Sequence, residues 1–284
     1  MVKLVTLLKI SRPGLWLVFV WLYLWPTGGN FELLTSPVFW IGLVYSTFPL
    51  NLLVYGMNDL VDEDTDSNNP RKGNYIYGAK TSRKERSQLP FWMFVINLLT
   101  LAVVSAFTGE YVYLLLWFLA AFAVNYAYNM KPFQLSRKCP YEVPTMIVGH
   151  FLIPLFSCRI NGLPIPGLGS WIFNGLLLAR SHIWLEYADI FCDKNAGKRT
   201  FAVVVGPQAS FRTVIGLTLM ESFTAWWFLN SPVLALFSLF GVVVFSLSAT
   251  KEGVKEEKVH VSVSQSLVGG ALMVYLWTSK TLLS

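Results

Sequence analysis

The sequence predicts an all-α integral membrane protein with nine transmembrane helices. Two kinds of observation support this class. Hydrophobic residues make up 54% of the 284-residue chain and charged residues only 13%, whereas soluble domains carry about 25% charged residues. The mean hydropathy is +0.52, and apolar runs long enough to cross a bilayer recur along the whole chain. A soluble domain of this length could not bury so much apolar surface.

Nine apolar runs are predicted to span the membrane, because about 17–25 residues are needed to cross it. They lie at residues 14–34, 38–57, 90–108, 111–130, 142–159, 170–188, 211–229, 232–249 and 260–282. The first is interrupted by Pro26 and by Gly28-Gly29, and could be shorter. It superficially resembles a signal peptide, but no small-residue cleavage site follows it, so we expect a retained helix.

The distribution of basic residues predicts the orientation of these spans. Connections on the side of the N-terminus hold 19 of the 22 Lys and Arg residues. Only Arg159 and Lys280 fall on the opposite side, and Arg180 lies within a span. We therefore expect the N-terminus and the long connections 67–89 and 194–210 on the cytoplasmic, positive side. The formal charge of +6 follows from this topology, and with no nucleic-acid-binding motif we expect no nucleic acid partner.

Two stripes of acidic residues close spans on this positive side. The stretch from Asn58 to Asp66 holds five carboxylates in nine residues. Continued as a helix at about 100° per residue, it places four oxygen-bearing side chains on one face, namely Asn58, Asp59, Asp62 and Asp66. Asp64 points away from this face, and we expect it to be solvated. Farther along the chain, four ionisable side chains recur at helical spacing: His182, Glu186, Asp189 and Asp193.

Carboxylates on one helix face repel each other unless cations lie among them. Magnesium takes a few carboxylate oxygens and keeps its remaining positions for water and phosphate oxygens. Two facing carboxylate groups could therefore hold Mg²⁺ ions that bridge a diphosphate. The alternative is a solvated acidic loop. The second Asp-x-x-x-Asp, which Gly197-Lys198-Arg199-Thr200 follows on the same side of the membrane, argues against that alternative.

These motifs resemble those of the UbiA superfamily of intramembrane prenyltransferases, which includes UbiA-type terpene cyclases. The resemblance also includes the nine spans and two short motifs, Ser11-Arg12-Pro13 and Tyr128-x-x-Lys131-Pro132. It covers nearly the whole chain, so we expect residues 1–284 to form a single UbiA-like transmembrane domain. It implies helices around a central cavity that cytoplasmic-side loops cap.

The resemblance implies roles for individual residues. Six would hold Mg²⁺ and the diphosphate of an isoprenoid donor: Asn58, Asp59, Asp62, Asp66, Asp189 and Asp193. Four of these, Asp62, Asp66, Asp189 and Asp193, would be catalytic because they assist the breaking of the C–O bond, whereas Asp59 could instead support the ligands. Five cations would bind the diphosphate and stabilise it as leaving group: Arg12, Lys72, Lys131, Lys198 and Arg199. For each cation the alternative is a topology signal or a snorkelling side chain.

Ionisable groups inside spans are expensive and often functional. Glu186 lies one turn deeper than Asp189, and His182 lies one turn beyond it. This spacing indicates an acceptor-binding or proton-accepting pair in which Glu186 is a catalytic residue. The alternative is a structural contact between the two at i, i+4. Asn125 and Tyr128 are candidates to line the cavity and bind substrate, with packing as the alternative.

The predicted function is Mg²⁺-dependent transfer of a prenyl group from an isoprenyl diphosphate to a lipophilic acceptor, aromatic or polyene, in the lipid bilayer. The runs from Tyr55 to Asp59 and from Asn69 to Gly73 resemble the carotenoid-elongating branch. A terpene cyclase, in which the ionised donor closes on its own double bonds, is the nearer alternative. A membrane transporter with an intramembrane relay of acidic residues is the distant one.

Overall fold

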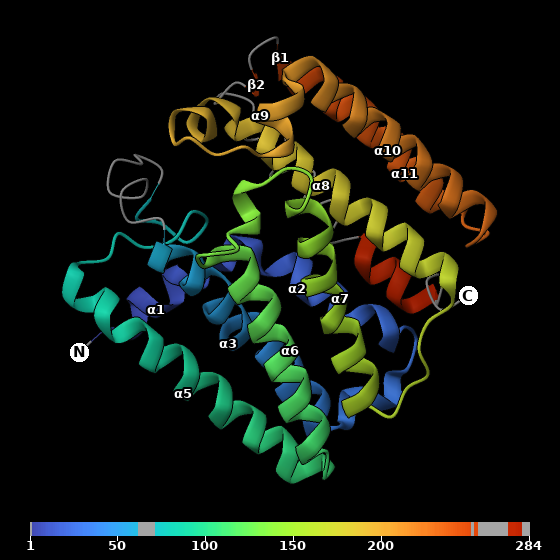
Figure 1. The fold of residues 1–284 in the computed structure, drawn as a ribbon. Helices are drawn as coiled ribbons and strands as arrows, with labels where there is room; N and C mark the ends of the chain where they lie inside the picture. Colours follow the sequence, from blue (N-terminus) through green and yellow to red (C-terminus); the bar gives the residue numbers. More distant parts are fainter. Residues whose placement is uncertain (1, 62–71, 251–252, 255–271, 280–284) are drawn as a thin grey trace. The chain divides into compact units, whose positions relative to one another are not determined.

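The computed structural model describes residues 2–61, 72–250, 253–254 and 272–279 (Figure 1). This part of the chain is helical apart from a hairpin of two short strands, β1 (Ala249–Thr250) and β2 (Gly253–Val254). Two compact units form. The first comprises residues 1–134 and 148–165, and the second comprises residues 135–147 and 166–284. The prediction of an all-α protein is confirmed.

The first unit is built around one long helix, α3 (Pro37–Val61), which packs against α2 and α5. Its other elements are α1 (Leu4–Ile10), η1 (Pro13–Leu15), α2 (Trp16–Leu24), η2 (Trp25–Thr27), η3 (Phe31–Thr35), α5 (Arg83–Thr108), α6 (Tyr111–Asn129) and most of α7 (Glu142–Ile160). Aromatic rings of α3, α6 and α7 form a buried centre, in which the ring of Phe156 lies 5.2 Å from Tyr45 and 4.9 Å from Trp117. This centre fixes the three helices against one another.

The end of α3 is positioned by contacts with α5. Pro49 lies inside α3 and cannot donate a helical hydrogen bond. The side-chain amide of Asn97 on α5 donates to the Pro49 carbonyl at 2.8 Å. Helix α5 begins with a capping box at Ser82 and Glu85 and ends at Gly109, which has the left-handed backbone that favours glycine. Its start is therefore fixed directly after residues 72–82.

The described part of the second unit has three long helices, a helical segment at residues 272–279 and several short elements. Apart from residues 272–279, these are η4 (Leu135–Arg137), the first residues of α7, α8 (Leu168–Asn195), α9 (Phe201–Val205), α10 (Pro207–Trp227), α11 (Pro232–Ser248) and the hairpin. Helix α10 packs against both α8 and α11. Arg180 of α8 forms a buried ion pair with Glu221 of α10, and its guanidinium lies 5.0 Å from the Phe245 ring. Pairing is what makes such buried charges tolerable.

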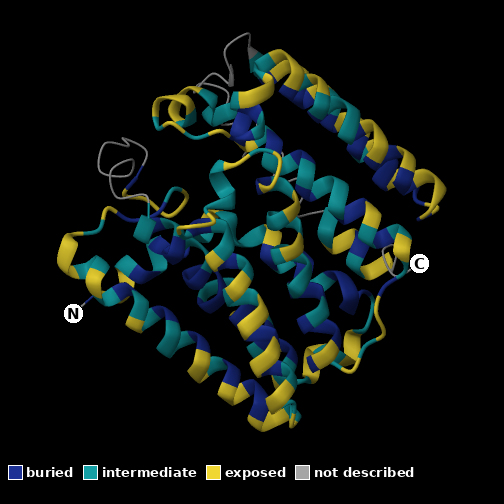
Figure 2. Cartoon of the chain, viewed as in Figure 1, coloured by how far each residue is buried: buried dark blue, intermediate teal, exposed yellow. Residues whose placement is uncertain are grey.

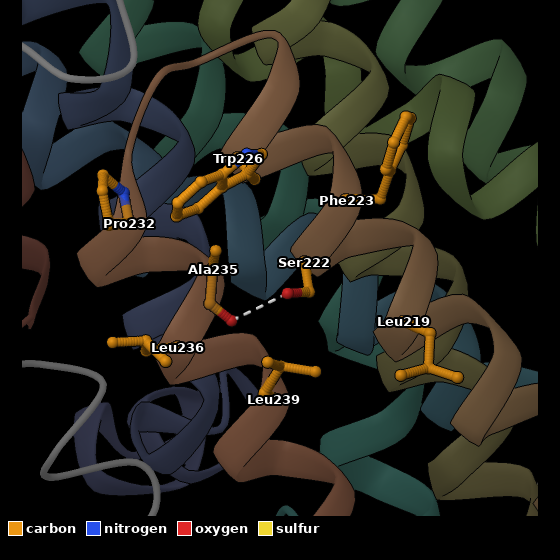
Figure 3. Close-up of a pocket in the computed structure, with 8 residues that line it drawn as sticks. All are labelled: Leu219, Ser222, Phe223, Trp226, Pro232, Ala235, Leu236 and Leu239. Carbon is orange, nitrogen blue, oxygen red and sulfur yellow. Dashed lines mark hydrogen bonds between the residues drawn. The ribbon is translucent and has the colours of Figure 1, made fainter.

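The outer face of α10 and α11 is apolar and hollowed. Figure 3 shows the hydroxyl of Ser222 donating to the Ala235 carbonyl, at 2.9 Å, which ties the two helices together. Beside this contact lies a groove of about 420 Å³, lined mainly by Leu219, Phe223, Trp226, Leu236 and Leu239. Large exposed apolar side chains also occur along α5 and α6 (Figure 2). Such surfaces are expected of helices that face lipid.

In the described part of the chain, five helical segments are long and apolar enough to cross a membrane: Leu4–Thr27, Pro37–Val61, Arg83–Thr108, Tyr111–Asn129 and Glu142–Ile160. Helix α11 is a shorter apolar helix. The predicted spans 170–188 and 211–229 are helical, as parts of α8 and α10, but are not among the five. Of the ninth span, 260–282, residues 272–279 are helical and the rest lies outside the described residues. The count of nine spans, the cavity and the single domain therefore stay predictions.

The first span lies nearer the N-terminus than the predicted range 14–34, because it runs from Leu4 to Thr27. Helix α2 ends at Leu24, and Pro26 lies in the short turn that follows. Residues after Gly28 and Gly29 continue as a separate 3₁₀ turn. The physical reason is that proline removes a helical hydrogen bond and glycine weakens the helix on entropic grounds.

Candidate functional site

The end of α3 carries a buried carboxylate that two cations share. The side chain of Asp59 is 3% exposed, and its Oδ1 lies 2.9 Å from Arg12 Nη2 and 2.7 Å from Lys72 Nζ. Lys72 is itself buried. Charge-assisted hydrogen bonds of this kind are about twice as strong as neutral ones. We call Arg12, Asp59 and Lys72 the α3 charge cluster.

Arg12 reaches this cluster because the chain turns sharply between α1 and η1. Its backbone has a φ of 50°, in the left-handed region, directly before Pro13. The guanidinium carbon then lies 4.5 Å from the centre of the Tyr55 ring on α3, which is a cation–π arrangement. Its Nη2 also donates to Asn58 Oδ1 at 3.3 Å. The first acidic motif and the N-terminal segment are thereby joined.

The loop of residues 72–78 lies over the cluster. The amide of Gly73 donates to the Gly78 carbonyl at 2.8 Å, and Gly14 N donates to the Tyr75 carbonyl at 3.0 Å. Gly78 has a φ of 93°, and a Cβ there would lie 3.3 Å from Lys72 Nζ and 3.4 Å from Asp59 Oδ2. This position therefore requires glycine for both its backbone and its space.

Two polar atoms of the cluster are buried without a hydrogen-bond partner in the described part of the chain, Arg12 Nε and Asp59 Oδ2. Buried polar atoms are rarely left in this state. One nitrogen is a donor that suits an anion, and one oxygen is an acceptor that suits a cation or a donor group. Asp62 and Asp66, the next members of the motif, lie outside the described residues.

The end of α8 carries the second motif. Asp189 and Asp193 lie one turn apart, and Lys198 Nζ is 3.1 Å from Asp193 Oδ1. Asp193 lies beyond the predicted span 170–188. Burial raises the pKa of the Asp193 carboxyl, Lys198 opposes this, and the carboxylates of Asp189 and Glu186 raise it further. The three acids thus repel one another, and a bound cation would relieve the repulsion.

The basic segment after α8 is held on two sides. Its Arg199 pairs with the chain before α7, because Cys139 N donates to the Arg199 carbonyl at 2.8 Å and Arg199 N to the Arg137 carbonyl at 3.1 Å. Two carboxylates then accept the first amides of α9. Glu142 Oε1 accepts from Phe201 N at 2.7 Å, and Glu186 Oε2 accepts from Ala202 N at 3.3 Å. Free amides at a helix start require such partners.

The structure brings some predicted site residues together within each unit. Arg12, Asn58, Asp59 and Lys72 meet in the first unit, and Glu186, Asp189, Asp193 and Lys198 meet in the second. Of three other predicted site residues, Lys131 and Arg199 are exposed, and Tyr128 is half-buried. Asn125 is buried and donates to the Leu53 carbonyl at 3.2 Å. Among the described residues no three His, Cys, Asp or Glu side chains form a metal-binding group, so the six-residue magnesium set stays a prediction.

Three residues of these sites were not predicted from the sequence. Tyr55 lies one turn before Asp59, and Asn129 lies one turn after Asn125, so helical spacing could have found both. Glu142 is the first residue of α7, and its side chain is fully buried. An acidic residue in a first helical turn usually interacts with its own helix, and this masks its role as a cap for α9.

The profile of the UbiA prenyltransferase family matches residues 15–260. The chain belongs to this family. Among its relatives is a lycopene elongase/hydratase of Corynebacterium glutamicum, 28% identical over 229 residues, which are 78% of this chain and 77% of that protein. Another, of Halobacterium salinarum and with the same name, is 24% identical over 268 residues, covering 90% and 88%. The C(50) beta-cyclic carotenoids biosynthesis protein LbtBC of Dietzia sp. is 33% identical over 227 residues, covering 73% and 48%.

The UbiA fold is also found by comparison with solved structures. A UbiA homolog from Archaeoglobus fulgidus bound to GPP and Mg²⁺ superposes with a TM-score of 0.73 at 16% identity, covering 98% of this chain and 99% of that one. The same homolog bound to DMAPP and Mg²⁺ gives the same score at 17% identity. As a member of the UbiA prenyltransferase family, the chain is a membrane-embedded, prenyl-transferring enzyme.

Proposed function

We propose that this enzyme elongates a carotenoid-type polyene, taking the prenyl group from an isoprenyl diphosphate in a Mg²⁺-dependent reaction. The observation that carries the choice of acceptor is the likeness to lycopene elongases/hydratases over 78% or more of the chain. The choice of donor and metal is supported by the fold relative that binds GPP and Mg²⁺. An aromatic acceptor has no comparable support.

The described residues suit magnesium. Asp59 Oδ2 is a buried oxygen without a hydrogen-bond partner among the described residues, and the repelling carboxylates at the end of α8 favour a cation. We propose that Asn58, Asp62, Asp66, Asp189 and Asp193 hold Mg²⁺, which when bound neutralises the diphosphate as the C–O bond breaks. Asp59 already serves two cations, so its part is to position them.

The cations of both units are proposed to bind the donor diphosphate. Arg12 and Lys72 are fixed by Asp59, and Lys198 is fixed by Asp193. Lys131 and Arg199 are exposed and able to reach phosphate oxygens. Fixed cations stabilise the leaving pyrophosphate without having to reorganise during the reaction.

The remaining chemistry joins two hydrocarbons. Carbon 1 of the donor forms a bond to a terminal double bond of the polyene while its C–O bond to pyrophosphate breaks, and the resulting cation then loses a proton or takes up water. We propose Tyr128 as a cavity residue. Glu186 contacts His182 at 3.2 Å and Ala202 N, and these contacts favour a positioning role for it over the proton-accepting one.

We also propose how the protein is oriented in the membrane. The basic connections, the N-terminus and the loop of residues 72–78 lie on the cytoplasmic side, and residues 1–284 act as a single domain. Labelling of a cysteine introduced at Lys9 in sealed, oriented vesicles tests the orientation. Labelling by a reagent that cannot cross the membrane, added from the cytoplasmic side only, is expected.

The test of function uses the purified protein in lipid nanodiscs with labelled dimethylallyl diphosphate, lycopene and MgCl₂. Pyrophosphate and a polyene heavier by one prenyl unit are expected, and chelation of Mg²⁺ should abolish both. A cyclic product from donor alone would instead show a terpene cyclase. Prenylation of an aromatic acceptor but not of lycopene would overturn the choice of acceptor. Absence of pyrophosphate with every acceptor would overturn the proposal.

A further inference from the structure

Four hydrogen bonds connect Arg12 to the backbone of α3 through three asparagine side chains. Arg12 Nη2 donates to Asn58 Oδ1 at 3.3 Å, and Asn58 Nδ2 donates to Asn129 Oδ1 at 3.3 Å. Asn129 Nδ2 donates to Asn125 Oδ1 at 2.7 Å, and Asn125 Nδ2 donates to the Leu53 carbonyl at 3.2 Å. We call Asn58, Asn129 and Asn125 the amide relay. It leaves α3, crosses two residues of α6 and returns to α3.

All four bonds of the relay run in the same direction, with each amide nitrogen donating toward Leu53. Asn125 and Asn129 are 8% and 3% exposed, so their amides need partners inside the protein. Aligned hydrogen bonds in a low-dielectric interior strengthen one another. Reversal of the Asn58 amide would place its NH₂ against the Arg12 guanidinium and its oxygen against Asn129 Oδ1. The relay therefore locks the orientation of Asn58, with its oxygen toward Arg12.

We propose that Asn129 is a positioning residue of the donor site. By accepting from Asn58 Nδ2, it keeps the Asn58 oxygen turned toward the cations and the metal that bind the donor diphosphate. Asn125 supports Asn129 in this arrangement rather than touching substrate. The inference rests on the proposed function, because Asn58 matters for donor binding only if the donor binds at this motif.

The competing explanation is that the relay only fastens α6 to α3. The protein contains a natural control for this explanation in Asn97. Its side chain is fully buried and fastens α5 to α3 through the Pro49 carbonyl, and it takes no part in the relay. Removing Asn97 should cost stability without a selective effect on the donor.

The experiment compares Asn129→Leu, Asn129→Asp and Asn97→Leu in nanodiscs. Each is measured for the rise in Tm that geranyl diphosphate with Mg²⁺ produces, and for donor KM and kcat. Asn129→Leu should raise donor KM roughly tenfold, the size expected for losing one buried hydrogen bond, and should shrink the Tm rise. Asn129→Asp should have an intermediate effect, because its oxygens still accept from Asn58 Nδ2. Asn97→Leu should lower the Tm without ligand and keep the donor-induced rise.

A double variant tests whether Asn129 acts through Asn58. In an Asn58→Ala background, Asn129→Leu should raise donor KM less than twofold, since residues in one network are not additive. A full tenfold effect in that background, or an unchanged donor response in Asn129→Leu, would overturn the relay alone. A wild-type protein with neither turnover nor a Tm rise would overturn the proposed function, and the role of the relay with it.

Discussion

The two acidic helix ends are stabilised in opposite ways. At the end of α3, one buried carboxylate, Asp59, is neutralised by two cations. At the end of α8, Lys198 pairs with Asp193, the carboxylates of Asp189 and Glu186 act on the same Asp193 carboxyl, and Glu142 and Glu186 cap α9. Among the described residues, the first end thus places two cations on one carboxylate, and the second end places three acids with one lysine. This difference teaches that two similar sequence motifs can balance their charges in different ways: the first shares one carboxylate between two cations, and the second brings acids together whose repulsion a bound cation would relieve.

The largest effect is expected from removing a carboxylate of the second end. Asp189→Ala should lower turnover at least about a thousandfold, because it leaves a single aspartate of that motif to hold the metal, and electrostatic groups of this type contribute about that much. Glu32→Ala is the matched control, because Glu32 is exposed and lies in η3, outside both acidic motifs. Turnover is measured as pyrophosphate release. If the turnover of Asp189→Ala stays within tenfold of the wild type, the distinction between the two helix ends fails.

The second largest effect concerns stability, which substitutions at the two helix ends should change by different amounts. Asp59→Asn should lower the free energy of unfolding by about 3 kcal/mol, because it leaves two cations without their buried counter-charge. Asp193→Asn should cost little. The pKa of Asp193 is raised, so its folded form binds a proton more tightly than its unfolded form, and ionisation at neutral pH costs folding free energy.

The difference between Asp59 and Asp193 should also appear in how the stability of the protein depends on pH. The contribution of Asp193 to stability is fully present below the ordinary pKa of aspartate, about 3.9, and is lost as the pH rises through its raised value. Unfolding of the wild type and Asp193→Asn in detergent, measured from acid to neutral pH without metal, should show the two curves converging toward acid. Equal losses of stability for Asp59→Asn and Asp193→Asn at pH 7 would contradict the distinction.

A smaller effect is expected from Glu142, which positions rather than binds. Glu142→Ala should raise donor KM about fivefold with little change in kcat, because the start of α9, which follows Lys198 in the chain, loses one of its two carboxylate caps. Glu142→Gln keeps an oxygen that accepts from Phe201 N and should restore most of the affinity. If the glutamine variant is as poor as alanine, charge rather than capping is what Glu142 provides.

The smallest effect tests the loop over the first end. Lys9 Nζ donates to the Gly73 carbonyl at 3.0 Å in an exposed position, and exposed contacts of this type contribute little. Lys9→Met should therefore change donor KM by no more than about twofold. Steady-state kinetics at low and high salt check this. A tenfold change would mean that the loop depends on Lys9 rather than on the cluster beneath it.

The membrane class and the helical segments could be predicted because they depend on local composition. Apolar periodicity and length locate four helices, α3, α5, α6 and α7, to within a few residues. The larger differences occur where polar helical turns extend a helix beyond its apolar run, as at the start of α5. The break after Leu24 was indicated by Pro26 for the same local reason. The second acidic motif could also be found, because helical spacing places its members on one face of α8.

The partners of these motifs could not be predicted. Asp59 is 47 residues from Arg12 and 13 from Lys72, and the contacts depend on how the loop of residues 72–78 closes. The sequence marks Arg12 and Lys72 as basic residues on the positive side, which many lysines and arginines share. Glu142 and Phe201 are 59 residues apart, and no periodicity connects them. Tertiary closure decides which charges meet.

The fixed cations of the α3 charge cluster should also affect the release of the product pyrophosphate. Arg12 and Lys72 are held by Asp59, through contacts within the protein itself. In the proposed reaction they would therefore grip the departing pyrophosphate as firmly as they gripped the donor head group. Inorganic pyrophosphate should compete with the donor, and an added pyrophosphatase should speed the later turnovers more than the first.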